Sequence, residues 1–174
     1  MTFLQGHWQN NVSAFALDVQ TWAIDALGPQ KLDSWFGTGA AYALWQKTKA
    51  FSACYDAHGQ LAGVGFTNEH DRISVEWTAG AILATRLLAR YYHSDNLAWA
   101  DGAQRDSRSM RKGIESLRHR IQKGIEAYSY SSRRDWIPFG WNSHDAQVLS
   151  LAATGWVILI DRDLNPFYFF SPGV

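Results

Sequence analysis

The sequence predicts an all-α fold in which antiparallel helical hairpins are arranged in an inner and an outer layer. Five segments have the length and apolar spacing of helices, and they alternate along the chain between two kinds. Segments 12–27, 74–92 and 145–160 are apolar on nearly every face, whereas 38–51 and 103–128 have a polar face. A helix that is apolar all round must be enclosed by protein, so the first kind is expected inside. A plain four-helix bundle ranks second, because it would give every helix a similar polar face.

Local signals place the ends of these helices. The first helix stops at Gly28-Pro29, a pair that interrupts helices. The second follows the turn-rich stretch "WFGTG". Segment 103–128 is expected to be one amphipathic helix, because apolar residues recur every three or four positions from Met110 to Ile125.

Two segments are expected not to be helical. Residues 53–67 alternate in character around the turn-like "DAHG", which predicts a short β-hairpin or an extended loop. Residues 129–144 are expected to form a long aromatic loop before the last helix. The prediction is thus a single helical-hairpin domain over residues 1–174.

Length and composition exclude several classes of protein. The 174 residues suffice for one ordinary domain, and no linker divides them. Basic and acidic residues number 16 each, so no net field favours nucleic acid or an anionic membrane. No apolar run reaches the roughly 18 residues of a membrane span. We therefore expect neither nucleic acid nor a membrane as a partner.

The cellular compartment is left open by the sequence. Cys54 is the only cysteine, so no internal disulfide indicates an oxidising environment. The N-terminal stretch has neither the basic start nor the apolar core of a signal peptide.

Aromatic residues are unusually frequent in this sequence, with nine tryptophans, seven tyrosines and nine phenylalanines. Many stand beside polar residues in "GHWQNN", "FTNEHDRIS" and "YSYSSRRDWIPFGWNSH", the segments that precede the inner helices. If those helices run parallel, the three segments meet at one rim, which is the usual form of a ligand site. Rings beside amides and guanidiniums suit sugars, although a tryptophan-rich core is an equal alternative for any single ring.

The candidates for binding a sugar at this rim are Trp8, His70, Trp77, Tyr130, Arg133, Arg134, Trp136 and Trp141. His7 and His144 belong to the same segments. Neither H-x-x-x-H nor C-x-x-C spacing occurs, so no metal is predicted. The glycine-rich nucleotide motifs are also missing, so no cofactor is expected.

Three stretches resemble the inner helices of six-hairpin, (α/α) toroid glycosidases. "SVEWTAGAILATRLL" is similar to their W-x-E-G-T-A helix, with Trp and Glu transposed and the glycine later. "IPFGWNSHDAQVLSLAATGWVILIDRDLNPF" resembles their terminal S-x-A-S-T-A-W helix, which ends at N-P-F, and "ALDVQTWAIDALG" resembles an earlier inner helix. The resemblance implies a partial (α/α) toroid, glycoside hydrolysis and a secreted or periplasmic parent protein.

A complete ring of that kind needs more hairpins than this chain supplies. The resemblance therefore implies the C-terminal half of a longer toroid, a reduced half-toroid, or one member of an assembly that completes the ring. Large apolar flanks would otherwise be exposed, so we expect either a missing N-terminal half or a homo-oligomer.

Glycoside hydrolysis requires two carboxyl groups, one that protonates the leaving oxygen and one that acts as base or nucleophile. Glu76 is the first choice for the acid, because apolar surroundings would raise its pKa. Asp71 or Glu69, just upstream, would supply the second carboxylate, and Asp18 is a more distant candidate. The alternatives are structural: Glu76 would stabilise the start of its own helix, Asp71 would cap it, and Asp18 would pair with a basic side chain.

The sequence favours an enzyme, a glycoside hydrolase that cleaves a cellulose-like or other β-linked glucan. The competing class is a non-catalytic module that binds carbohydrate or has a purely structural role. A terpene-cyclase-like protein ranks last, because no D-x-D-D or D-D-x-x-D motif is present.

Overall fold

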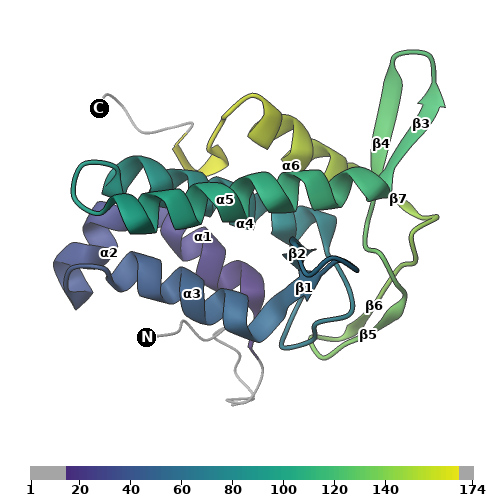
Figure 1. Cartoon of the computed structure of the whole chain (residues 1–174). Helices are drawn as coiled ribbons and strands as arrows, with labels where there is room; N and C mark the ends of the chain where they lie inside the picture. Colours follow the sequence, from purple (N-terminus) through teal and green to yellow (C-terminus); the bar gives the residue numbers. More distant parts are fainter. Residues whose placement is uncertain (1–14, 169–174) are drawn as a thin grey trace.

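The computed structural model describes residues 15–168, and this part of the chain contains both helices and strands (Figure 1). The helices are α1 (Leu17–Leu27), α2 (Pro29–Phe36), α3 (Ala40–Ser52), α4 (Val75–Tyr92), α5 (Leu97–Gly113) and α6 (Leu151–Asp161), with the 3-10 helices η1 (Ile114–Leu117) and η2 (Pro166–Tyr168). The strands are β1 (Ala53–Tyr55), β2 (Leu61–Val64), β3 (Arg118–Gln122), β4 (Ile125–Ser129), β5 (Asp135–Ile137), β6 (Trp141–Ser143) and β7 (Leu149–Ser150).

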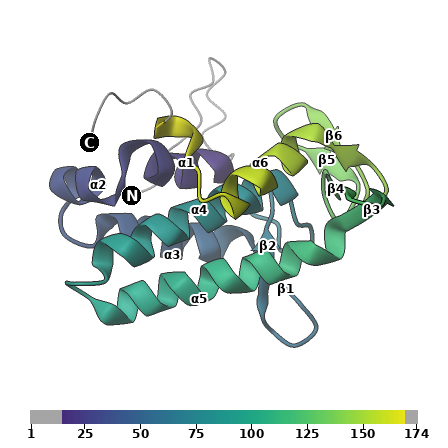
Figure 2. The ribbon, with the colours of Figure 1, turned by 90° about the horizontal axis from the view of Figure 1, so that it is seen from above.

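Helix α4 lies at the centre, between α1 and α6 on one side and α5 on the other (Figure 2). Small residues such as Ala79, Gly80 and Ala84 are buried and allow the neighbouring helices to approach closely. The helix begins at Ser74, whose hydroxyl accepts a hydrogen bond from the backbone N–H of Trp77 at 3.3 Å. As the sequence predicts, α4 is buried on nearly every face.

Helix α1 packs against α4 and runs in the same direction. The indole nitrogen of Trp22 lies 2.9 Å from where a Cβ on Gly80 would be, so glycine is required for this contact. Towards the other end, Leu27 and Tyr91 line the same surface hollow. The first turns of α1 and α4 therefore lie at the same end.

Helix α6 also runs parallel to α4. Near the start of α4, Glu76 accepts a hydrogen bond from Trp156. Near its end, Arg90 pairs with Asp163, just beyond α6, at 2.9 Å. All three helices that the sequence places inside thus begin on the same side of the molecule.

The strands form three small antiparallel sheets, β1–β2, β3–β4–β7 and β5–β6. Strands β1 and β2 form the short hairpin expected near 53–67, with Ala53 opposite Val64. The other two sheets were not anticipated. The prediction of an all-α fold, and of a partial toroid, is therefore wrong: the fold is a mixed one of helices and small sheets.

The largest error concerns segment 103–128, which is not one helix. Helix α5 ends at Gly113, where a Cβ would overlap the backbone carbonyl of Ala62 on β2. Strands β3 and β4 then turn back at Gly124, which has a φ of +79°. Ile121 and Ile125 keep the helical spacing but are exposed on the hairpin, so a periodic pattern continued beyond the end of the helix.

Segment 129–144 is more ordered than a loop, because β5 and β6 pair within it. The last helix begins later than expected, at Ser150, whose hydroxyl accepts the N–H of Ala153 at 3.1 Å.

One side of α6 is apolar and exposed. Leu151 is 90% exposed and Ile158 is 57% exposed, and Leu149 beside them is also exposed. A partner that covers this surface, either a second copy or another part of a longer chain, remains a prediction. Among the described residues, no helix has the length and apolarity needed to cross a membrane.

The contact at Gly113 gives a test of the fold. Gly113→Ala should lower the free energy of unfolding by about 2 kcal/mol or more, because β2 leaves no room for the methyl group. Gly155→Ala, in α6, is the matched control: no atom of the residues that the structure describes lies within 4 Å of its Cβ position. Alanine there should be neutral or stabilising by up to about 1 kcal/mol. Equal effects of the two substitutions in urea denaturation would contradict the packing of α5 on β2.

Candidate functional site

Two half-buried carboxyl groups lie at the N-terminal end of the parallel helices. Asp18 is in the first turn of α1, and Glu76 is in the first turn of α4. Because Trp22 contacts Gly80 one helical turn further along, Asp18 and Glu76 are level on adjacent helices. Burial raises the pKa of both carboxyl groups, and the charge of Asp18 raises that of Glu76 further.

A stack of two indoles adjoins this pair. Trp156 donates a hydrogen bond to Glu76, which partly offsets the rise in its pKa. The ring of Trp156 stacks on Trp22, with centroids 5.6 Å apart and an interplanar angle of 10°. Phe167 of η2 packs against both indoles, with centroids at 6.0 and 6.3 Å.

Residues of the β-rich segment approach the pair from another side. The indole of Trp141 donates to the hydroxyl of Tyr130 at 2.9 Å. Burial raises the pKa of Tyr130, and the charge of Glu76 adds to this, which places Tyr130 near the carboxylate. Trp141 also packs on Phe139, with centroids 5.8 Å apart. Trp156 and Tyr130 therefore lie near Glu76, and Trp22 and Trp141 pack against these two residues.

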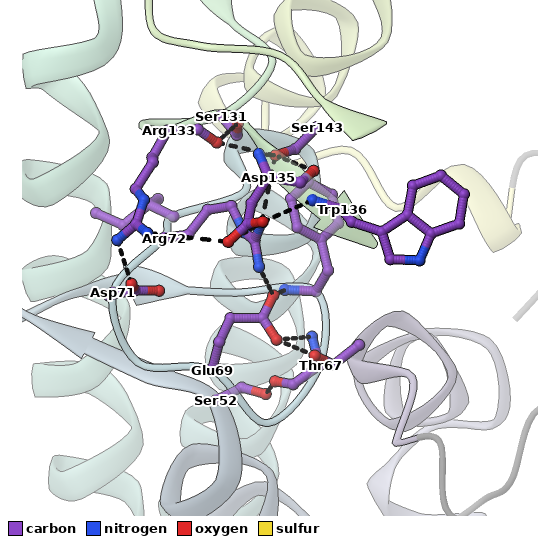
Figure 3. A network of polar contacts seen from close by, with 12 residues as sticks. Ser52, Thr67, Glu69, Asp71, Arg72, Ser131, Arg133, Asp135, Trp136 and Ser143 are labelled. Carbon is purple, nitrogen blue, oxygen red and sulfur yellow. Dashed lines mark hydrogen bonds and ion pairs between the residues drawn. The ribbon is translucent and has the colours of Figure 1, made fainter. Parts of the chain in front are cut away.

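A buried arginine fixes the segment that carries these aromatics (Figure 3). Arg72 is only 4% exposed, and its guanidinium contacts Glu69 at 3.0 Å and Asp135 on β5 at 3.5 Å. It also donates to Ser143 on β6 at 3.5 Å and lies over the ring of Phe66. Arg72 thus ties the loop before α4 to both strands of the β5–β6 hairpin.

Glu69 is occupied by structural contacts. Besides the ion pair with Arg72, its carboxylate accepts the backbone N–H groups of Phe66 and Thr67, at 3.2 and 3.1 Å, and the Thr67 hydroxyl. His70, the next residue, makes a 2.9 Å hydrogen bond with the Ala53 carbonyl. Both side chains hold the loop before α4 in place.

Asp71 lies at the exposed edge of the same network, where it pairs with Arg133 (Figure 3). Arg134 is exposed as well. The indole of Trp136 is 57% exposed and extends away from the network, as Figure 3 shows. Trp136 is thus available to a ligand.

Trp77 differs from its expected position at the rim. It is 6% exposed and packs on Phe66 and Phe139 in the core. Trp8 and His7 lie outside the described residues. His144 packs edge-on against Tyr130 at 5.7 Å. Among residues 15–168, no group of histidine, cysteine, aspartate and glutamate side chains could hold a metal ion.

Sequence reasoning ranked Asp18 last and did not consider Trp22 and Trp156. The signal was present, because Asp18 and Trp22 are four residues apart and therefore share one face of α1. Which helix that face contacts could not be read from the spacing.

Comparison of the chain with family models, curated proteins and solved structures finds no match. The chemistry of the site is therefore the basis for any functional conclusion.

The Arg72 network predicts a difference between two arginines. Arg72→Met should cost about 3 kcal/mol of stability, because it leaves Glu69 and Asp135 without their buried cation. Arg133→Met removes an exposed ion pair and should cost less than about 1 kcal/mol. Urea denaturation measures both, and similar costs would contradict the proposed role of Arg72.

A third carboxyl group, Asp25 of α1, is fully buried, and neither oxygen has a hydrogen-bond partner among residues 15–168. Burial raises its pKa well above the ordinary value of 3.8. The folded state therefore binds this proton more tightly, and stability should fall as pH rises from about 4 towards the raised pKa. Asp25→Asn should lack this part of the pH dependence and be more stable than the wild type at pH 7. The free energy of unfolding of both proteins is measured between pH 4 and 7. If the two curves run parallel, Asp25 does not contribute to the pH dependence of stability.

Proposed function

We propose that the protein is a glycoside hydrolase that acts on a β-linked glucan. The observation that carries this proposal is the pair Asp18 and Glu76, two half-buried carboxyl groups level with each other and bordered by aromatic rings. Hydrolysis of a glycosidic bond uses two such groups with different protonation states. The resemblance of the three helical stretches to toroid glycosidases supports the same activity, although the overall fold is mixed.

The environment of each carboxyl group suggests its role. The ordinary pKa of an aspartate, 3.8, is lower than that of a glutamate, 4.5, so we expect Asp18 to ionise first; its charge then favours the protonated form of Glu76. Glu76 is then the general acid, and Asp18 takes the place that Asp71 or Glu69 was expected to fill. Those two acids form ion pairs with Arg133 and Arg72, which assigns them a structural role instead.

The reaction needs only these two carboxyl groups and a water molecule. Glu76 gives its proton to the glycosidic oxygen as the bond to the anomeric carbon breaks. A water molecule attacks that carbon, and Asp18 accepts the proton that this water loses. Such a direct displacement inverts the anomeric configuration.

The aromatic residues supply surfaces for sugar rings. Tyr130 lies near Glu76 and carries Trp141, and the exposed indole of Trp136 suits a more distant sugar unit. Arg133 and Arg134 would contact hydroxyl groups at the same edge. A non-catalytic carbohydrate-binding module would use the same surfaces, so the carboxyl pair is what distinguishes the two functions.

Loss of either carboxyl group tests the activity. Glu76→Gln and Asp18→Asn should each reduce release of reducing sugars from a soluble β-glucan by at least a hundredfold. Their thermal midpoints should remain within a few degrees of the wild type, because both groups are partly exposed. Asp71→Asn is the matched control and should retain activity.

Full activity in Glu76→Gln, or its failure to fold, would contradict the assignment. If the wild type binds oligosaccharides without turnover, the binding module is favoured. If it neither binds nor hydrolyses them, a structural role is favoured.

A titration tests the coupling of the two groups without any substrate. In protein labelled with ¹³C at the glutamate carboxyl carbon, the pKa of Glu76 should lie above its ordinary value of 4.5. In Asp18→Asn it should be lower than in the wild type, because the repelling charge is gone. An unchanged pKa would show that the two carboxyl groups do not interact.

A further inference from the structure

A groove of about 840 Å³ lies between α3, the β1–β2 hairpin and α5. It shares no lining residue with the carboxyl pair, and α5 borders the opposite side of α4 from α1 and α6 (Figure 2). This volume falls within the usual range for sites that bind small molecules.

The groove carries an excess of positive charge. Four basic and two acidic side chains line it: Lys49, Arg105, Arg108, Lys112, Asp56 and Asp106. Both acids are already engaged, since Asp106 accepts from Lys49 at 2.7 Å and from Trp45 at 2.8 Å, and Asp56 accepts the backbone N–H groups of its own turn.

The three cations of α5 are left for a ligand. Arg105, Arg108 and Lys112 are exposed, and no carboxylate among the described residues lies within ion-pair distance of them. They are three and four residues apart, so they share one face of α5 over about 10 Å. A row of this kind suits a ligand with several negative charges along its length, and not a single point charge.

The uncharged lining indicates what carries those charges. The ring of Tyr55 is 56% exposed, and Gln60, Ser109 and Ser116 offer an amide and two hydroxyls. An aromatic ring beside such donors and acceptors suits a sugar ring, which stacks through its C–H face while its hydroxyl groups form hydrogen bonds. We infer that the groove binds an anionic oligosaccharide, with carboxylates on the α5 cations and a sugar ring on Tyr55.

The inference stands apart from the hydrolase proposal, because the two sites have no residue in common. A glycan-binding groove would also remain if the carboxyl pair proved inactive.

Titration calorimetry of the full chain with a galacturonic acid hexamer tests the inference. The hexamer should bind, its affinity should fall with added salt, and the neutral glucose hexamer should not bind at this groove. Arg108→Gln should weaken binding of the acidic hexamer about tenfold or more. Tyr55→Ala should weaken it about three- to tenfold.

Arg162→Gln is the control, since Arg162 is exposed at the end of α6, outside the groove, and its loss should leave the affinity unchanged. An equal loss in Arg162→Gln, or no binding by the wild type, would overturn the inference. The assignment to a glycan would be overturned if inorganic hexaphosphate bound as tightly as the acidic hexamer and its affinity were unchanged in Tyr55→Ala. Glu76→Gln should bind the acidic hexamer like the wild type, so failure of either proposal can be recognised separately.

Discussion

The close approach of α1 to α4 at Gly80 is the constraint on which the site depends. With no side chain on Gly80, the indole of Trp22 can lie against α4, and it stacks in turn on Trp156 of α6. This contact sets the relative height of three parallel helices. It places the first turns of α1 and α4 level, and thereby brings Asp18 and Glu76 together. Two carboxyl groups that are both partly buried cannot easily be ionised at once, so the packing itself separates their protonation states.

The Arg72 network complements this arrangement. The parallel helices fix the carboxyl groups, whereas the aromatic residues on the ligand side come from the segment between β4 and α6. Arg72 is buried, and its ion pairs with Glu69 and Asp135 hold that segment against the loop before α4. A rigid support of this kind allows surface side chains such as Trp136 to present a defined face to a sugar.

The sequence predicted the parts of the fold that depend on local patterns. Apolar spacing and turn residues predict the buried helix α4, the end of α1 at Gly28 and the β1–β2 hairpin. Helix α6 was expected to be enclosed as well, but one side of it is exposed. The prediction of one helix over 103–128 is wrong because Ile121 and Ile125 fit both a helical and an alternating pattern. The close packing of Gly113 on the backbone of β2 is a tertiary contact that the sequence does not reveal. For the candidate site, the sequence proposes Glu76 from its place in the first turn of an apolar helix and ranks its neighbour Asp18 lower. Proximity between helices distant in sequence is a property of packing, which no spacing rule contains.

A double-mutant cycle on β-glucan hydrolysis tests the central claim, that Asp18 and Glu76 act as one unit. The rates of the wild type, Glu76→Gln, Asp18→Asn and the double variant would be compared under the same conditions. If the two groups share one reaction step, the double variant should be no slower than the slower single variant. Losses that simply multiply, or an Asp18→Asn variant as active as the wild type, would contradict the account.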